Sequence, residues 1–271
     1  MMELEEVEAV KARMRRMWDM GDYRPLSQRL EPAARELADA CAVSAGQEVL
    51  DVAAGDGNFA LACAREGASV VASDLAPGMV ERGRARSERE GYEIEWIEAD
   101  AEDLPFEDGR FDCVGSVFGA MIAPRPERVT AELFRVVRPG NTVGMVAWVP
   151  GGFLPDLFAL GRRFSPPPPG SARSEDWGDE EIVRDRLRGV AAHVECERGT
   201  LVWTAASPEA LEAEMGKNTP SFVAAREGLP HDAFEQLRGA TLELIHRHNV
   251  ATDGSLQLHA EYLITVARRR G

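Results

Sequence analysis

The spacing of apolar positions divides the chain into two opening helices followed by a long alternation of strands and helices. Leu4, Val7 and Met14 belong to a stripe at helical spacing, which predicts a helix over residues 3–20, and a similar stripe predicts a second helix over 25–41. Further along, short runs rich in β-branched residues alternate with helical patterns bounded by proline and glycine. The predicted strands are 49–53, 69–73, 94–98, 111–117, 142–148, 193–205 and 256–268, and the predicted helices between them are 58–66, 77–90, 126–137, 208–216 and 231–248.

Strands that alternate with helices are typical of βαβ units, so the expected fold class is α/β. We expect a doubly wound, Rossmann-like, mostly parallel sheet in a single domain over residues 1–271. The final strand is long, which favours an antiparallel partner. Residues 151–190 are rich in proline and glycine and include the run Pro166–Pro169, which favours an extended segment. We interpret 151–190 as an insertion over the ligand edge of the sheet.

Charge and cysteine content narrow the function classes. The chain has 31 Lys and Arg against 46 Asp and Glu, a formal net charge of −15, so its field repels nucleic acid. The four cysteines lie far apart without metal-ligand spacing, and no metal site is predicted. No apolar run is long enough to span a membrane, and the charged N-terminus is unlike a signal peptide. A cytoplasmic protein, monomeric or homodimeric, is expected.

The stretch VLDVAAGDGNFA, residues 49–60, places a glycine loop directly after a buried strand. Gly55, Gly57 and Ala60 satisfy the pattern of a dinucleotide-binding loop. Asp51 and Asp56, however, would repel a diphosphate. A simple strand-to-helix turn without a ligand leaves these acids unexplained. A cationic, phosphate-free nucleoside such as S-adenosylmethionine fits both the glycines and the acids, while a nicotinamide-dependent oxidoreductase stays open as an alternative.

Four motifs in sequence order resemble those of class I S-adenosylmethionine-dependent methyltransferases, close to the small-molecule group that includes ubiquinone and menaquinone biosynthesis enzymes. They are VLDVAAGDG, VVASDLAPGMV, IEADAEDLPFEDGRFD and ELFRVVRPGNTV, and the match covers residues 45–150. The resemblance implies the strand order 3-2-1-4-5-7-6, with strand 7 antiparallel and an N-terminal helical lid, residues 1–42. It also implies S-adenosylmethionine as cofactor and S-adenosylhomocysteine as product. Many relatives have glycine at the position of Ala53.

The resemblance also implies roles for individual residues. Asp74 would bind the ribose hydroxyls, with Leu75 and Met79 beside the adenine, and Asp100 and Ala101 would meet the adenine amino group and ring edge. From the sequence, Asp74 follows Gly57 at nearly the spacing of a ribose-binding acid. The predicted cofactor-binding residues are Tyr23, Asp51, Ala53, Gly55, Asp56, Gly57, Asp74, Leu75, Met79, Asp100, Ala101, Glu102, Ser116 and Val117.

The methyl acceptor is expected on the far side of the methyl group, against the segment GSVFGAMIAPRP, residues 115–126. This segment lacks the polar Asn/Asp-Pro-Pro-aromatic motif of relatives that methylate nitrogen in amides or bases, so a small, partly apolar or aromatic acceptor is predicted. Methyl transfer from a sulfonium depends mainly on alignment, and no catalytic residue is assigned. The predicted substrate-binding residues are Trp18, Phe118, Met121, Trp148, Phe153 and Trp177. A protein that binds the cofactor for other chemistry, or none, is the alternative within the fold.

Overall fold

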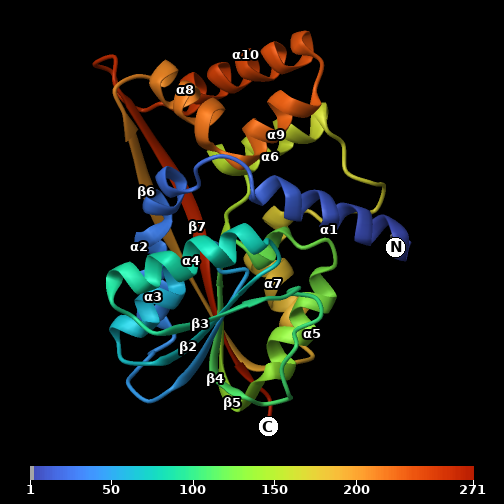
Figure 1. Ribbon diagram of the computed structural model, residues 1–271, viewed down its shortest axis with the longest axis vertical. Helices are drawn as coiled ribbons and strands as arrows, with labels where there is room; N and C mark the ends of the chain where they lie inside the picture. Colours follow the sequence, from blue (N-terminus) through green and yellow to red (C-terminus); the bar gives the residue numbers. More distant parts are fainter. Residues whose placement is uncertain (1–2) are drawn as a thin grey trace.

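The computed structural model describes residues 3–271 and contains one seven-stranded sheet (Figure 1). The strand order is β3-β2-β1-β4-β5-β7-β6, and β7 is antiparallel to both of its neighbours. The predicted sheet order and strand direction are therefore confirmed. The strands are β1 (Glu48–Val52), β2 (Ser69–Asp74), β3 (Ile94–Glu98), β4 (Phe111–Val117), β5 (Val137–Trp148), β6 (Ala191–Ala205) and β7 (Leu256–Arg269).

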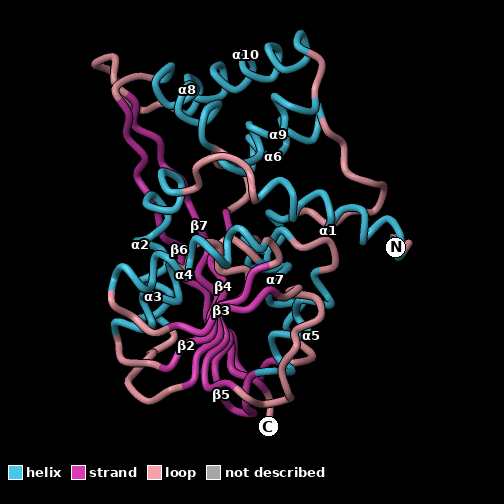
Figure 2. The backbone as a smooth tube through the Cα atoms, viewed as in Figure 1, coloured by secondary structure: helices cyan, strands magenta, loops and turns pink. Residues whose placement is uncertain are grey.

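Helices cover both faces of this sheet (Figure 2). One face carries α2 (Arg24–Ala40), α3 (Asn58–Arg65) and α4 (Pro77–Glu90), and the other carries α5 (Pro126–Val136) and α7 (Glu180–Leu187). Because both faces are covered, the inner strands are buried and apolar, as in Val49, Leu50 and Val114. Gly115 is required where β4 meets α3, since a Cβ at this position would lie 2.2 Å from the Phe59 ring.

The two last strands extend well beyond the rest of the sheet as a long ribbon (Figure 1). A group of helices gathers at the far end of this ribbon, and we call it the cap: α6 (Phe153–Phe164), α8 (Pro208–Asn218), α9 (Pro220–Gly228) and α10 (His231–His248). Helix α9 was not expected from the sequence. Thr219 and Pro220 end α8 and start α9 in immediate succession, so a second short helix directly follows the one predicted over 208–216.

Helix α1 (Leu4–Trp18) lies between the sheet and the cap (Figure 1). The loop after α1 is tied to α4, because the Arg82 guanidinium donates hydrogen bonds to the carbonyl oxygens of Trp18 and Asp19 and the Asp19 carboxylate accepts one from Gly78 N. Residues 1 and 2 of the predicted 1–42 segment lie outside the described residues.

Residues 151–190 divide between two places. Helix α6 joins the cap, whereas η2 (Ser174–Gly178) and α7 pack on the sheet face beside α5 and β5. The proline run between them forms no helix or strand. The position of this segment over a ligand stays a prediction.

Candidate functional site

A cavity of about 90 Å³ lies at the carboxyl ends of β1, β2 and β4. This is the edge at which ligands bind in open α/β sheets. Fourteen predicted site residues gather here: Trp18, Tyr23, Asp51, Ala53, Gly55, Asp56, Asp74, Leu75, Met79, Asp100, Ala101, Val117 and Phe118 line the cavity, and Gly57 belongs to the same loop. Lys11, Met14, Leu30, Ala54, Asn58, Phe59, Ala99, Gly119, Ala120, Ile122, Ala123 and Pro124 also line it.

Three carboxylates form one side of the cavity, which we call the carboxylate wall: Asp51, Asp74 and Asp100. Asp74 ends β2, and its two carboxylate oxygens accept hydrogen bonds from Gly55 N at 2.8 Å and Ala76 N at 2.9 Å. Burial raises the pKa of the Asp74 carboxyl to about 6, although these hydrogen bonds act in the opposite direction. The wall therefore contains a buried acid that is held rigidly at the end of a strand.

Asp51 lies deeper, in β1, and accepts a hydrogen bond from Ala60 N at 2.9 Å, in the first turn of α3. Only 1% of Asp51 is exposed, and burial raises the pKa of its carboxyl well above the usual range. The carboxylates of Asp74 and Asp56 raise the pKa further. A cationic ligand group in this cavity would relieve that crowding of negative charge.

The glycine loop that follows β1 needs backbone conformations that favour glycine. Gly55 and Gly57 have φ of +58° and +92°. A Cβ at Gly55 would lie 3.2 Å from Cε1 of Tyr23, so the tyrosine ring rests on the loop. Burial, with added repulsion from Asp56 and Asp74, raises the pKa of Tyr23, which keeps its hydroxyl a hydrogen-bond donor.

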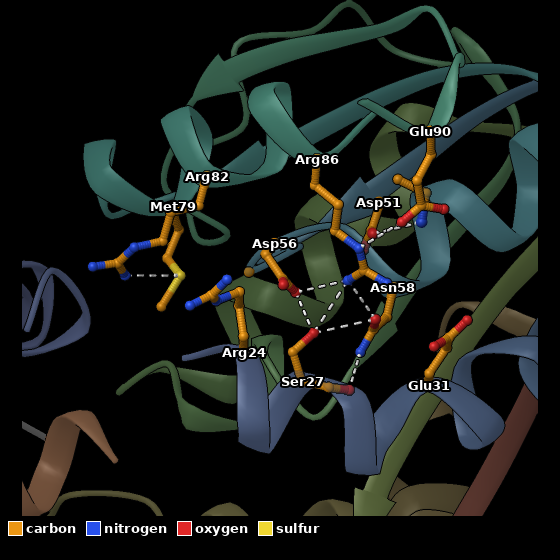
Figure 3. A network of polar contacts seen from close by, with 12 residues as sticks. Arg24, Ser27, Glu31, Asp51, Asp56, Asn58, Met79, Arg82, Arg86 and Glu90 are labelled. Atoms are coloured by element: carbon orange, nitrogen blue, oxygen red, sulfur yellow. Dashed lines mark hydrogen bonds and ion pairs between the residues drawn. The ribbon is translucent and has the colours of Figure 1, made fainter. Parts of the chain in front are cut away.

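The Asp56 carboxylate is already paired with other side chains of the protein. It forms an ion pair with Arg86 of α4 at 3.1 Å and accepts a hydrogen bond from Ser27 of α2 (Figure 3). Arg86 also donates to Asn58 Oδ1 at 2.8 Å and pairs with Glu90. The negative charge of Asp56 is thus compensated by the protein, and Asp51 and Asp74 contribute more of the field that a cationic ligand meets.

Asp100 and Glu102 follow β3 and share a cation from α1. Lys11 Nζ lies 2.5 Å from Asp100 Oδ2 and 2.6 Å from Glu102 Oε2. Glu102 is fully buried behind Asp100 and does not line the cavity. Burial alone would lower the pKa of Lys11, but its hydrogen bonds with Asp100 and Glu102 raise it, so the side chain is an ammonium.

A second group of lining residues comes from 117–124, which we call the apolar wall. Its lining members are Val117, Phe118, Gly119, Ala120, Ile122, Ala123 and Pro124. Phe118 stacks on Trp148 with ring centroids 3.7 Å apart and has a φ of +57°. Ala53, at the start of the glycine loop, has a φ of +54°. Left-handed conformations in two non-glycine residues mark local backbone strain in the lining of the cavity.

The other predicted site residues lie behind these walls. Ser116 is buried, donates a hydrogen bond to the Val52 carbonyl oxygen and accepts one from Ala120 N. Met121, which follows Ala120, is also buried. Trp148 backs Phe118, Phe153 packs edge-on against Trp203 in the cap, and Trp177 lies under the Arg186 guanidinium at 4.3 Å. None of these five lines the described cavity.

Two residues that sequence reasoning missed are central to the site: Lys11 and Arg86. Lys11 lies in helical register with Val7 and Met14, so a lysine within the apolar stripe of the first helix was the available signal. Arg86 had no such signal, because α4 is rich in arginine. Its role depends on how α4 packs beside the glycine loop.

Within the described part of the chain, no group of three or more His, Cys, Asp or Glu side chains is arranged to hold a metal ion. Among residues 3–271, no helix combines the length and the apolar content needed to cross a membrane.

Comparison with known proteins places this site in a family. Residues 49–140 match the sequence model described as a methyltransferase domain. An uncharacterized protein of Mycobacterium tuberculosis is 40% identical over 189 residues, which are 69% of this chain and 69% of that protein. A demethylmenaquinone methyltransferase of Clavibacter sepedonicus is 43% identical over 104 residues, 38% of this chain and 42% of that protein.

A solved structure shows the same fold. It is phosphoethanolamine N-methyltransferase 2 of Haemonchus contortus in complex with phosphomonomethylethanolamine and S-adenosylhomocysteine, with a TM-score of 0.56 and 18% identity, covering 89% of this chain and 53% of that one. The stretch matched by the family model, 49–140, contains all three members of the carboxylate wall and the whole apolar wall.

Proposed function

Because the chain belongs to the class I S-adenosylmethionine-dependent methyltransferases, we propose that it methylates a small, partly apolar or aromatic acceptor. The observation that carries the proposal is that one cavity is lined both by the carboxylate wall and by the apolar wall. The first suits a cationic nucleoside and the second suits an apolar acceptor. A diphosphate-bearing nicotinamide cofactor would face the buried carboxylates of Asp51 and Asp74, which disfavour it.

The residues present fit S-adenosylmethionine, whose bound sulfonium supplies an activated methyl group. Asp74 keeps free lone pairs in addition to its two backbone hydrogen bonds and would accept hydrogen bonds from a ribose diol. Leu75 and Met79, which line the cavity, would give an apolar surface for the adenine, and Asp100 with Ala101 would lie at its edge. The Tyr23 hydroxyl, a donor above the glycine loop, would serve the methionine carboxylate.

The protein's own contribution is alignment and exclusion of water. The apolar wall would hold the acceptor opposite the carboxylate wall, so that its nucleophilic atom and the methyl–sulfur bond lie in line. Phe118 is fixed for this purpose by stacking on Trp148. Helix α1 covers the cavity with Met14 and Trp18 and limits the access of water.

The proposal is tested first by calorimetry and then by turnover. S-adenosylhomocysteine should bind and NAD should give no heat. The protein, supplied with S-adenosylmethionine and a panel of phenols, quinols, amines and thiols that includes demethylmenaquinol, should release S-adenosylhomocysteine with at least one acceptor. Cofactor binding without turnover across the panel would favour a protein that uses the bound nucleoside for other chemistry, and binding of NAD alone would reject the cofactor assignment.

A further inference from the structure

Helix α1 carries one charged side chain into the cavity. Lys11 lies between Val7 and Met14 on the buried face of the helix, and its residue surface is only 6% exposed. In Figure 1, α1 passes between the sheet and the cap. Lys11, Met14 and Trp18 of this helix line the cavity. A lysine in this position replaces an apolar residue that the helix pattern would otherwise accept.

The ammonium of Lys11 connects α1 to both walls. On one side it contacts Asp100 of the carboxylate wall at 2.5 Å. On the other it contacts Glu102 at 2.6 Å, and Glu102 in turn accepts hydrogen bonds from Arg125 N at 2.6 Å and Arg125 Nε at 2.7 Å. Arg125 directly follows the apolar wall and is the residue before α5. We call these four residues the Lys11 clasp: Lys11, Asp100, Glu102 and Arg125.

Fold stability alone does not explain such a cluster. Buried ion pairs add little net stability compared with apolar residues of similar volume, because desolvation offsets their attraction. Access to the cavity gives a better reason. Its volume of about 90 Å³ is small, whereas pockets for nucleoside-sized ligands measure roughly 300–1,000 Å³. A ligand of that size needs more room than this arrangement gives, and α1 is attached to the walls through the clasp.

We propose that Lys11 is a positioning residue that holds α1 closed over the bound cofactor and sets the rate at which cofactor and product exchange. The inference rests on the proposed cofactor site. When α1 moves away, Lys11 leaves Asp100, and the Asp100 carboxylate becomes available to the entering adenine edge. When α1 returns, Lys11 again joins the two walls. The same contact thus links cofactor occupancy to the shape of the acceptor side.

The test measures binding rates of S-adenosylhomocysteine by stopped-flow tryptophan fluorescence, since Trp18 lines the cavity. In Lys11→Met, the dissociation rate should rise about tenfold or more, because charge-assisted hydrogen bonds are lost. The association rate should also rise, by about threefold, because the closed form is less populated. A defect in folding or in direct ligand contact would not speed association.

The same helix offers a matched control. Arg15, one turn further along, pairs with Glu98 at 2.9 Å, and both side chains are about half exposed, 46% and 45%. Arg15→Met should leave both rates within about twofold of wild type, because exposed ion pairs contribute little. Lys11→Arg should restore part of the slow dissociation. The proposed role of the clasp would be overturned if Lys11→Met had the same association and dissociation rates as Arg15→Met. It would also be overturned if Lys11→Met bound S-adenosylhomocysteine more slowly than wild type.

Two further measurements keep the outcomes distinct. Asp74→Asn should weaken S-adenosylhomocysteine binding; if it does not, the proposed cofactor site itself is wrong, and the clasp falls with it. If Asp74→Asn binds weakly while Lys11→Met keeps wild-type rates, only the clasp is rejected. If Lys11→Met does not fold, hydrogen exchange in the wild-type protein tests the proposal instead. Bound S-adenosylhomocysteine should slow the exchange of backbone amides in residues 7–18. Unchanged exchange in these residues would overturn the proposal.

Discussion

The two walls of the cavity are held in place by different forces. Each member of the carboxylate wall accepts at least one hydrogen bond from a backbone N–H: Asp51 from Ala60, Asp74 from Gly55 and Ala76, and Asp100 from Glu102. The apolar wall is shaped by packing and by a strained backbone at Phe118. Changes of charge should therefore damage the first wall, and changes of volume or backbone freedom should damage the second.

The largest effect is expected on the apolar wall. Phe118 is 6% exposed and packs on Trp148 and, edge-on, on Tyr262. Phe118→Ala should lower the free energy of unfolding by about 3–5 kcal/mol, measured by urea denaturation, because a large buried ring is removed. Calorimetric affinity for S-adenosylhomocysteine should stay within about threefold of wild type. A loss of binding free energy as large as the loss of unfolding free energy would mean that the two walls do not act separately.

The positive φ of Phe118 sharpens this test. In an ordinary strand, glycine is less stable than alanine by roughly 0.5–1 kcal/mol. At a φ of +57°, alanine is strained by about 1–2 kcal/mol and glycine is not. Phe118→Gly should therefore be at least as stable as Phe118→Ala. A clearly less stable glycine variant would contradict the left-handed conformation.

Arg86 tests how the charge behind the carboxylate wall is balanced. Its side chain and that of Asp56 are 12% and 7% exposed, so Arg86→Met leaves a buried carboxylate without its cation. The free energy of unfolding should fall by about 3 kcal/mol. The double variant Arg86→Met with Asp56→Asn should recover part of this loss, which a double-mutant cycle measures.

A more exposed ion pair, between α3 and α4, provides the control for Arg86. Arg65 pairs with Glu90 at 2.8 Å, with side chains 32% and 29% exposed. Arg65→Met should cost no more than about 1 kcal/mol. Equal losses in the two arginine variants would show that burial of Asp56 does not decide the effect.

The pH dependence of binding tests Asp74 itself. With a pKa near 6 in the free protein, Asp74 is protonated below pH 6 and ionised above it. A ribose diol donates hydrogen bonds, which the ionised form accepts better. Affinity for S-adenosylhomocysteine should therefore rise by about fivefold between pH 5 and pH 7 and level off above, if the pKa of Asp74 falls by about one unit on binding. Asp74→Asn should bind weakly at every pH, and a pH dependence that persists in it would belong to another group.

The same raised pKa affects stability with a defined sign. The pKa of Asp74 is about 6 in the folded protein, against an ordinary value of 3.8, so the folded state holds more protons between these pH values. The contribution of Asp74 to the free energy of unfolding therefore decreases as pH rises from about 4 to about 6. Binding and stability should change in opposite directions over this range.

The carboxylate wall could be predicted from the sequence because its positions follow from local rules. Asp74 and Asp100 come directly after or at the end of short apolar runs, and parallel strands place such ends along one edge. Gly55 and Gly57 indicate the glycine loop in the sequence, because few other residues adopt their backbone conformations. The order of the strands in the sheet could likewise be predicted, from the alternation of strands and helices together with the family's motifs.

The acceptor side could not be predicted to the same extent, because it depends on packing between distant segments. Their aromatic character predicted a shared site for Trp148, Phe153 and Trp177. In the structure, Trp148 stacks on Phe118 behind the apolar wall, and Phe153 packs against Trp203. Trp177 lies on the side of α7, beside Arg186. Residues 208–248 carry ordinary helical patterns, and nothing local in them indicates that β6 and β7 extend far enough to hold them as a cap. Lys11 gave a signal, a lysine on an apolar face, but no indication of its partners.

The smallest effect on stability is expected from a substitution of Ala53, which stands where many relatives have glycine. At a φ of +54°, alanine is strained by about 1–2 kcal/mol, and Ala53→Gly removes this strain at the cost of a more flexible unfolded chain. The net gain in stability should be below about 1 kcal/mol, or a rise in melting temperature of roughly 2 °C by calorimetry. Its neighbour Ala54 is absent from the positive-φ residues of the described chain, so Ala54→Gly should instead lose about 0.5–1 kcal/mol. If both variants lost stability equally, the loop would tolerate alanine at position 53 without strain.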